Sequence, residues 1–152
     1  MKPITLSALL FTITLQGCAD GEQATRKNGD NRPCVANYSA EGSFWSGRQL
    51  KTFEDFPKAL KVSTFDNLLE TIAFSGYQII SSDQESGVIS ASQTVTGGQG
   101  KAVPLNAVVQ NNSAGGVRVE LVVTLLGGFI TSTDSLQDEF CKILASVNQN
   151  KN

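Results

Sequence analysis

The run from Val117 to Leu125 constrains the fold more than any other stretch of the chain. Every second residue in it is apolar, and three of the four residues between them are polar. Because successive side chains of a strand point to opposite faces, this alternation predicts a β-strand with one buried face. Such strands are typical of antiparallel sheets that are covered on one side. The apolar positions are Val117, Val119, Leu121, Val123 and Leu125.

Three more strands are predicted. Residues 77–82 and 88–94 are β-rich and are joined by turn-forming residues, which indicates a hairpin. Residues 102–109 alternate like the first run. Pro104 points to the other face there and has no N–H to donate, which favours an edge strand or the start of a strand. Residues 35–62 hold no lasting period, and we expect at most a short strand between Arg48 and Phe53.

Two amphipathic helices flank these strands. The first is predicted to begin at Ser63 or Thr64, where a hydroxyl can cap it, and to end at a left-handed Gly76. The second begins at Thr133 or Asp134. Apolar residues recur along one face of each helix. They are Phe65, Leu68, Leu69, Ile72 and Ala73 in the first helix and Leu136, Phe140, Ile143, Leu144 and Val147 in the second.

The order of elements is therefore helix, four strands, helix. One apolar sheet face and two apolar helix stripes are buried together when sheet and helices form two layers. We predict an α+β fold, a two-layer sandwich of a four-stranded antiparallel sheet packed by two helices. One extra N-terminal strand is an option.

The chain begins with features of an exported protein. Lys2 precedes about a dozen mostly apolar residues, which suits a signal peptide and is shorter than the roughly 20 residues of a membrane-spanning helix. The tetrapeptide Leu15-Gln16-Gly17-Cys18 then resembles a bacterial lipobox. This resemblance implies cleavage between Gly17 and Cys18 and acylation of the Cys18 thiol. An ordinary secretory signal cut nearby and a buried N-terminal segment are the alternatives.

A polar segment follows the expected anchor. It has almost no apolar side chains with which to offset the entropy of ordering, so we expect a flexible tether. The predicted organisation is a lipoprotein signal peptide at 1–17, a tether at 18–33 and a single α+β domain at 34–152. By resemblance to enterobacterial lipoproteins, Ala19 after Cys18 favours the outer membrane, with the domain facing the periplasm.

Two cysteines remain after Cys18. An exported protein permits their oxidation, and we expect a disulfide between Cys34 and Cys141. It would close a loop of about 107 residues and stabilise the fold by roughly 4 to 5 kcal/mol in the chain-entropy treatment. The alternative is two separate buried thiols.

Composition argues against several function classes. The formal net charge is −2; removing residues 1–17 takes away one lysine, which leaves 11 basic against 14 acidic residues, or −3. Because no stretch concentrates Lys or Arg, no nucleic-acid binding is expected. The chain has no histidine, the commonest general base and zinc ligand, and no Ser-x-x-Lys. We therefore expect no catalytic residues, no metal, no cofactor and no enzyme activity.

Three polar clusters could carry chemistry, but each has a simpler interpretation. Residues 97–101 are glycine-rich and could wrap an anion, yet they lack P-loop spacing, so an inter-strand loop is expected. Acids at the start of the last helix match its dipole. Acids in the hairpin turn bond their own backbone and are too few for calcium. These acids are Asp134, Asp138 and Glu139 in the helix and Asp83 and Glu85 in the turn.

Four aromatic residues precede the first predicted helix: Phe44, Trp45, Phe53 and Phe56. Trp and Phe are common at interface cores, so they could form an exposed patch for a partner. They could also cover the open side of the sheet or the seam between the helices. We favour this second interpretation.

The element order, with Phe74-Ser75-Gly76-Tyr77-Gln78-Ile79-Ile80, Asp83 and Gly87-Val88-Ile89-Ser90-Ala91, resembles small bacterial lipoproteins that carry one helix-grip domain. The lipoprotein subunit of the outer-membrane β-barrel assembly machine has domains of similar topology. The resemblance covers about residues 48–147 and implies a fold without transferring an active site.

The lipobox, the tether and the missing catalytic groups together favour a non-enzymatic envelope lipoprotein. Its partners would be the membrane, through the lipid on Cys18, and envelope proteins of an assembly at the periplasmic face of the outer membrane. The alternative is a binder of a small apolar ligand or lipid between sheet and helices, which an apolar cavity of about 300 Å³ or more would support.

Overall fold

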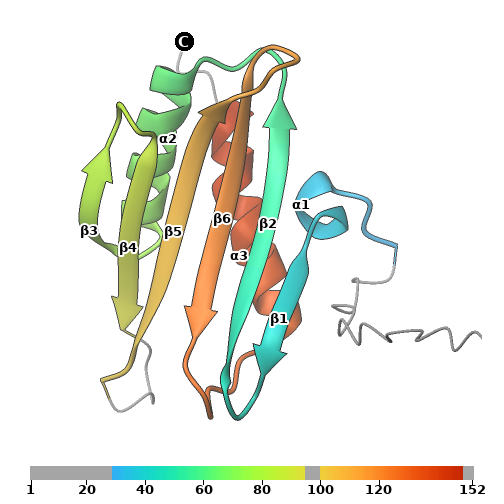
Figure 1. Ribbon diagram of the computed structural model, residues 1–152, viewed down its shortest axis with the longest axis vertical. Coiled ribbons are helices and arrows are strands. Elements are labelled where there is room, and N and C mark those ends of the chain that lie inside the picture. Colours follow the sequence, from blue (N-terminus) through green and yellow to red (C-terminus); the bar gives the residue numbers. More distant parts are fainter. Residues whose placement is uncertain (1–28, 95–99, 149–152) are drawn as a thin grey trace, which may run out of the picture.

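The computed structural model describes residues 29–94 and 100–148. Within these ranges the chain forms one antiparallel sheet of six strands in the order β1-β2-β6-β5-β4-β3, shown in Figure 1. The helices are α1 (Pro33–Ala36), α2 (Lys61–Phe74), α3 (Thr133–Ala145) and a final 3₁₀ turn (Ser146–Asn148). The strands are β1 (Ser39–Ser43), β2 (Gly47–Phe56), β3 (Gln78–Asp83), β4 (Val88–Thr94), β5 (Ala102–Asn111) and β6 (Val117–Leu125).

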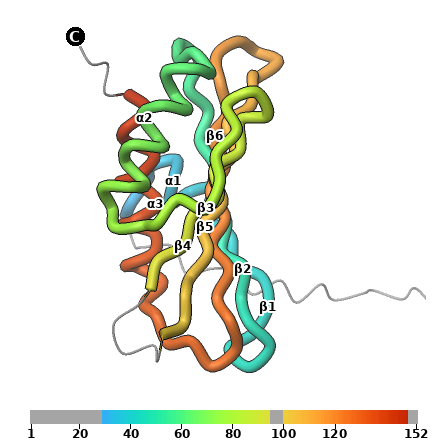
Figure 2. The backbone as a smooth tube through the Cα atoms, turned by 90° about the vertical axis from the view of Figure 1, so that its left-hand side faces the viewer, coloured from blue at the N-terminus to red at the C-terminus, as the bar shows by residue number. Residues whose placement is uncertain are grey.

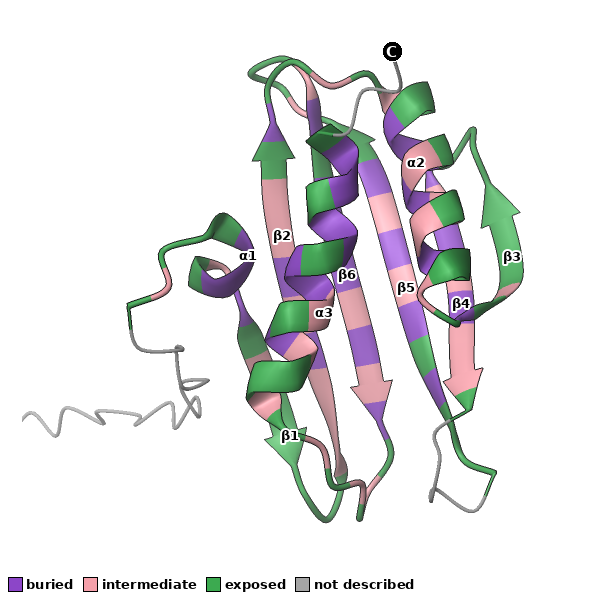
Figure 3. Cartoon of the chain, turned by 180° about the vertical axis from the view of Figure 1, so that it is seen from behind, coloured by how far each residue is buried: buried purple, intermediate pink, exposed green. Residues whose placement is uncertain are grey.

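The two long helices lie on the same face of the sheet, and the other face is open (Figure 2). All five alternating residues of β6 are buried, as predicted, and so are the four inward residues of β5. Purple bands on the strands and on the inner sides of α2 and α3 mark this shared core in Figure 3. The helices contribute Phe65, Leu68 and Ile72 from α2 and Phe140, Ile143 and Leu144 from α3.

The start of α2 differs from the prediction, whereas α3 begins at one of the two predicted residues. The first helix, α2, begins at Lys61 after an extended Leu60, and the Ser63 hydroxyl donates to the Leu60 carbonyl instead of capping the helix. It ends as predicted, because Gly76 takes a left-handed φ of 89°. The second, α3, begins at Thr133, with the Ser132 hydroxyl accepting from the Ser135 N–H.

The prediction of a four-stranded sheet is wrong, because β1 and β2 complete a sheet of six. The optional strand at 48–53 is part of β2, which pairs with β6 along its length. Three of the inward positions of β2 are polar or charged, Arg48, Thr52 and Glu54, and Phe53 faces the opposite side. Hydropathy therefore does not alternate along β2. In β1 only Ala40 is partly buried, so that strand has no apolar periodicity either.

Pro104 lies near the start of β5, an interior strand between β4 and β6. Its side chain points to the open face, as predicted, opposite Ser92 of β4. The position near the strand start matches one of the two expectations, whereas the edge position does not. The edges of the sheet are β1 and β3.

Candidate functional site

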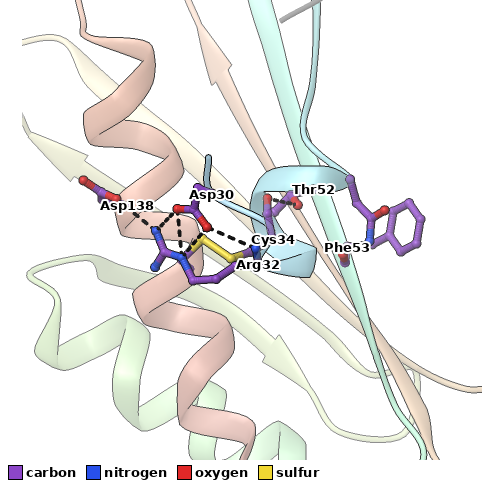
Figure 4. Close-up of a disulfide and its surroundings, with 8 residues drawn as sticks. Asp30, Arg32, Cys34, Thr52, Phe53 and Asp138 are labelled. Carbon is purple, nitrogen blue, oxygen red and sulfur yellow. Dashed lines mark hydrogen bonds and ion pairs between the residues drawn. A yellow bond between two sulfur atoms is a disulfide. The ribbon is translucent and has the colours of Figure 1, made fainter. Parts of the chain in front are cut away.

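The predicted disulfide is confirmed: Cys34 in α1 is bonded to Cys141 in α3, at a sequence separation of 107. Figure 4 shows this bond and its surroundings. Both cysteines are buried. The Thr52 hydroxyl donates to the Cys34 carbonyl oxygen at 2.7 Å. The start of the domain is thereby joined to α3 by a covalent bond and to β2 by a buried hydrogen bond.

An ion pair reinforces this attachment on the outer side of α3. The Arg32 guanidinium lies 2.6 Å from an Asp30 oxygen and 3.3 Å from an Asp138 oxygen, as Figure 4 shows. The hydrogen bond to Asp30 raises the pKa of Arg32. Asp138 was expected to be a solvated, dipole-matched residue, but its carboxylate also contacts the N-terminal segment. We call Asp30, Arg32, Cys34, Asp138 and Cys141 the N-terminal clamp.

A cavity of about 240 Å³ lies between the sheet and the N-terminal half of α3. Its walls mix apolar side chains with hydroxyl, amide and carboxylate groups. Tyr77 is buried there, and desolvation, with a smaller effect of nearby Glu139, raises its pKa to about 12. The phenol therefore stays protonated to a higher pH than an exposed tyrosine does. The lining consists of Ser75, Tyr77, Gln93, Val103, Leu125, Phe129, Thr131, Ser135, Leu136 and Glu139.

A second cavity, of about 410 Å³, lies at the C-terminal end of β2. Its lining includes Glu54, Pro57, Lys58 and Asn148. Burial raises the pKa of Glu54. The cavity offers one carboxyl group with an elevated pKa and a lysine, but no cysteine, serine or threonine that could act as a nucleophile.

In the part of the chain that the structure describes, no group of three or more His, Cys, Asp or Glu side chains could hold a metal ion. Among the same residues, no serine hydroxyl is hydrogen-bonded to a lysine; Lys61 instead donates to the Glu85 carbonyl at 2.7 Å.

The remaining polar clusters have structural roles where they are described. The Asp83 carboxylate accepts from the Glu85 and Ser86 N–H groups, which is the turn expected from the sequence. A hydrogen bond from the Ser86 side chain, followed by those from the Ser86 and Glu85 N–H groups, lowers the pKa of Asp83. Most of the glycine-rich segment 97–101 lies outside the described residues, as do Gly17, Cys18 and the expected tether up to residue 28.

The four aromatic residues do not share one environment. Phe56 is in the core, and Phe53 lies on the open face beneath the Arg118 guanidinium, 4.5 Å from its ring centroid. These two fit the favoured interpretation. In contrast, 85% of Trp45 and 39% of Phe44 are exposed.

Phe44 and Trp45 lie at one end of the sheet, where the loop between β6 and α3 carries two more exposed apolar residues. Leu126 is 56% and Ile130 87% exposed. We call Phe44, Trp45, Leu126 and Ile130 the apolar tip. Sequence reasoning did not single out Leu126 or Ile130. The signal that could have found them is the absence of charge from Leu121 to Thr133.

No protein-family model matches the chain, and no curated protein has a significantly similar sequence. None of the helices within residues 29–94 and 100–148 is long and apolar enough to cross a membrane.

Proposed function

We propose that this chain is a lipid-anchored lipoprotein of the bacterial envelope, without enzyme activity, that binds other envelope proteins at the periplasmic face of the outer membrane. One observation carries the proposal. Cys34 and Cys141 are bonded to each other, so the lipobox residue Cys18 is the one cysteine of three that remains for acylation. Persistent disulfides are also typical of exported proteins.

The N-terminal clamp supports an anchored role. A pull on an anchored chain reaches the domain through the residues that follow the tether. Here these residues are bonded to α3 through Cys34 and Cys141 and paired with it through Arg32 and Asp138. Tension would therefore be passed to the core of the domain and not to a single turn of helix.

The shape of the sheet supports binding to protein partners. Its open face and the edges β1 and β3 are available surfaces in the described part of the chain. Sheet edges present backbone N–H and C=O groups that can pair with another chain.

The anchor is tested by replacing Cys18. We expect the C18S variant to lose incorporation of labelled palmitate, globomycin-sensitive processing and fractionation with the outer membrane. Ala19→Ser, which keeps the cysteine, is the matched control and should behave like the parent chain. A C18S protein that still fractionates with the outer membrane would overturn the anchor.

The assembly role is tested by affinity purification of the lipidated protein from detergent-solubilised envelopes. A stoichiometric protein partner, retained at moderate salt, is expected. Recovery of the chain alone after cross-linking would count against the assembly role without affecting the anchor.

The second candidate, a binder of a small apolar ligand between the layers, has weaker support. The interlayer cavity of about 240 Å³ is below the roughly 300 Å³ at which small-molecule sites begin. The cavity of about 410 Å³ is larger, but the charged residues Glu54, Asp55 and Lys58 line it. Saturable binding of lauric acid that Leu136→Trp abolishes would favour this candidate. Absence of binding would remove it.

A further inference from the structure

The apolar tip is built from two loops that meet at one end of the sheet. Trp45 and Phe44 lie between β1 and β2, and Leu126 and Ile130 lie between β6 and α3. Both loops are at the lower end in Figure 1. The two residues that are most exposed, Trp45 and Ile130, come from different loops. The tip is therefore a surface formed by the fold and not by one sequence segment.

Contacts between the loops hold the tip in shape. The Gly128 N–H donates to the Phe44 carbonyl at 2.7 Å. Within the loop between β1 and β2, the Phe44 and Trp45 rings meet edge to face with centroids 5.0 Å apart. Gly127 packs so closely on the Trp45 carbonyl that a Cβ atom there would collide with it. Because these backbone contacts already order the loops, little entropy remains to be lost when the side chains bind a surface.

The chemistry of the tip fits a bilayer interface. No charged residue occurs between Glu41 and Arg48 or between Glu120 and Asp134. Charged groups are costly to place in a membrane, whereas an indole ring is favoured at the level of the headgroups. A protein interface would instead combine an apolar core with a polar rim that includes charged side chains.

The start of the domain lies close enough to the tip for both to reach one membrane. Ten residues, 19–28, separate Cys18 from Gly29, and a chain of that length reaches at most about 33 to 36 Å. Arg32 is paired with Asp138, five residues after Thr133. At about 1.5 Å per residue, Asp138 is roughly 8 Å along α3 from the end next to the tip.

We propose that the apolar tip inserts into the headgroup region of the phospholipid bilayer that carries the Cys18 anchor. This inference rests on the proposed lipid anchor and adds a second membrane contact. With one end of the sheet in the interface, the strands stand upright on the membrane, and the open face and both edges point sideways toward partners. The interlayer cavity, which shares Phe129 and Thr131 with the tip loop, opens near the membrane surface.

Trp45 makes the test direct, because it is the only tryptophan in the chain. The acylated protein is purified and reconstituted into vesicles of phosphatidylethanolamine with a minor share of phosphatidylglycerol. Relative to C18S protein in buffer, we expect the emission of Trp45 to shift to shorter wavelength. Quenching by acrylamide should fall, and phospholipids with brominated acyl chains should quench the emission.

The variants Leu126→Ser and Ile130→Ser should reduce quenching by brominated lipid, because they remove apolar side chains beside Trp45. A double Leu60→Ser and Val62→Ser variant is the matched control. These residues are 73% and 58% exposed at the opposite end of β2, near the start of α2, and their replacement should leave the quenching unchanged. All of these positions are exposed, and far-ultraviolet circular dichroism checks that each variant is folded.

The outcomes separate the tip from the anchor. An acylated, vesicle-bound protein whose Trp45 stays as accessible to acrylamide as in buffer would overturn tip insertion and leave the anchor standing. A protein that is never acylated would remove the anchor itself. Shielding of Trp45 in native envelopes but not in lipid vesicles would assign the tip to a protein partner. A concentration-dependent shift without lipid would assign it to a second copy of the chain.

Discussion

The helix-covered side and the open side of the sheet differ in what shifts their ionisable groups. On the covered side, desolvation raises the pKa of Tyr38 and of Tyr77 to about 12. On the open side, a shared hydrogen bond lowers the pKa of Asp55 and raises that of Arg118. Desolvation shifts the pKa values on the covered side, whereas ion pairing at the exposed surface shifts them on the open side. We infer that the covered side contributes most of the free energy of unfolding. The smaller contribution of the open side should change with salt and pH.

Two adjacent valines of β6 give the largest expected contrast. Val123 is fully buried under the helices, and Val122 is half-buried on the open face opposite Lys51 and Asn106. Val123→Ala should lower the free energy of unfolding by roughly 2 to 3 kcal/mol, from two carbon groups at about 0.8 kcal/mol each plus a cavity. Val122→Ala should cost less than about 1 kcal/mol. Urea unfolding with unchanged m-values measures both.

Equal losses in the two valine variants would break the comparison. They would mean that the open face is packed as tightly as the core. A change in m for one variant would instead point to an altered denatured state.

The tyrosines give a pH test of the covered side. They are the only two in the chain, and the pKa of each is raised from 10.0 to about 12. Well below pH 10 both phenols are protonated in the folded and unfolded states. As the pH rises from about 10 to about 12, the unfolded chain loses protons first, so the free energy of unfolding should fall.

The phenolate absorbance of the native protein should therefore stay low near pH 10 and rise only close to pH 12 or on unfolding. Tyr77→Phe should remove half of the signal without moving the rest. An ordinary native titration near pH 10 would show that water reaches these rings.

Helices and strands were predictable where burial of one face makes apolar residues recur at a regular spacing. In β6, β5, α2 and α3 the inward positions are almost all apolar, so the sequence alone located them. In β2 the inward Thr52 is satisfied by the Cys34 carbonyl, and Glu54 lies toward a cavity. Because these inward residues are polar, apolar and polar residues do not alternate along β2, and only an optional short strand could be predicted there from the sequence. The disulfide was predictable because setting Cys18 aside as the expected lipidation site leaves two cysteines and one pairing.

The candidate sites depend on residues that meet only in the folded chain. The interlayer cavity joins Gln93, Leu125 and Glu139, and the apolar tip joins Trp45 with Ile130. Each of these residues is ordinary in its own segment. Sequence patterns could indicate that an uncharged stretch exists, but not which second loop lies beside it.

The ion pair on the open face gives the smallest expected effect. Asp55 accepts from Arg118 at 2.7 and 2.8 Å, and this contact lowers its pKa below the usual 3.8. Because the carboxyl pKa is lower in the folded than in the unfolded protein, the ionised carboxylate stabilises the fold at pH values above the unfolded-state pKa. This contribution is lost as the pH falls through the folded-state pKa. Asp55→Asn should therefore destabilise slightly at neutral pH and not at all in acid. Added salt should shrink the difference, since the pair is exposed.

A double-mutant cycle of Asp55→Asn with Arg118→Gln isolates the coupling of this pair from its other contacts, among them the Asn112 amide, which donates to Asp55 at 2.7 Å. The coupling free energy, measured by urea unfolding at low and high salt, should fall as salt is added. A coupling free energy that changes with neither salt nor pH would mean that the pair is shielded from water. The two faces differ in that the ionisable groups of the open face are paired while exposed to water. Shielding of this pair would therefore remove the distinction between the two faces.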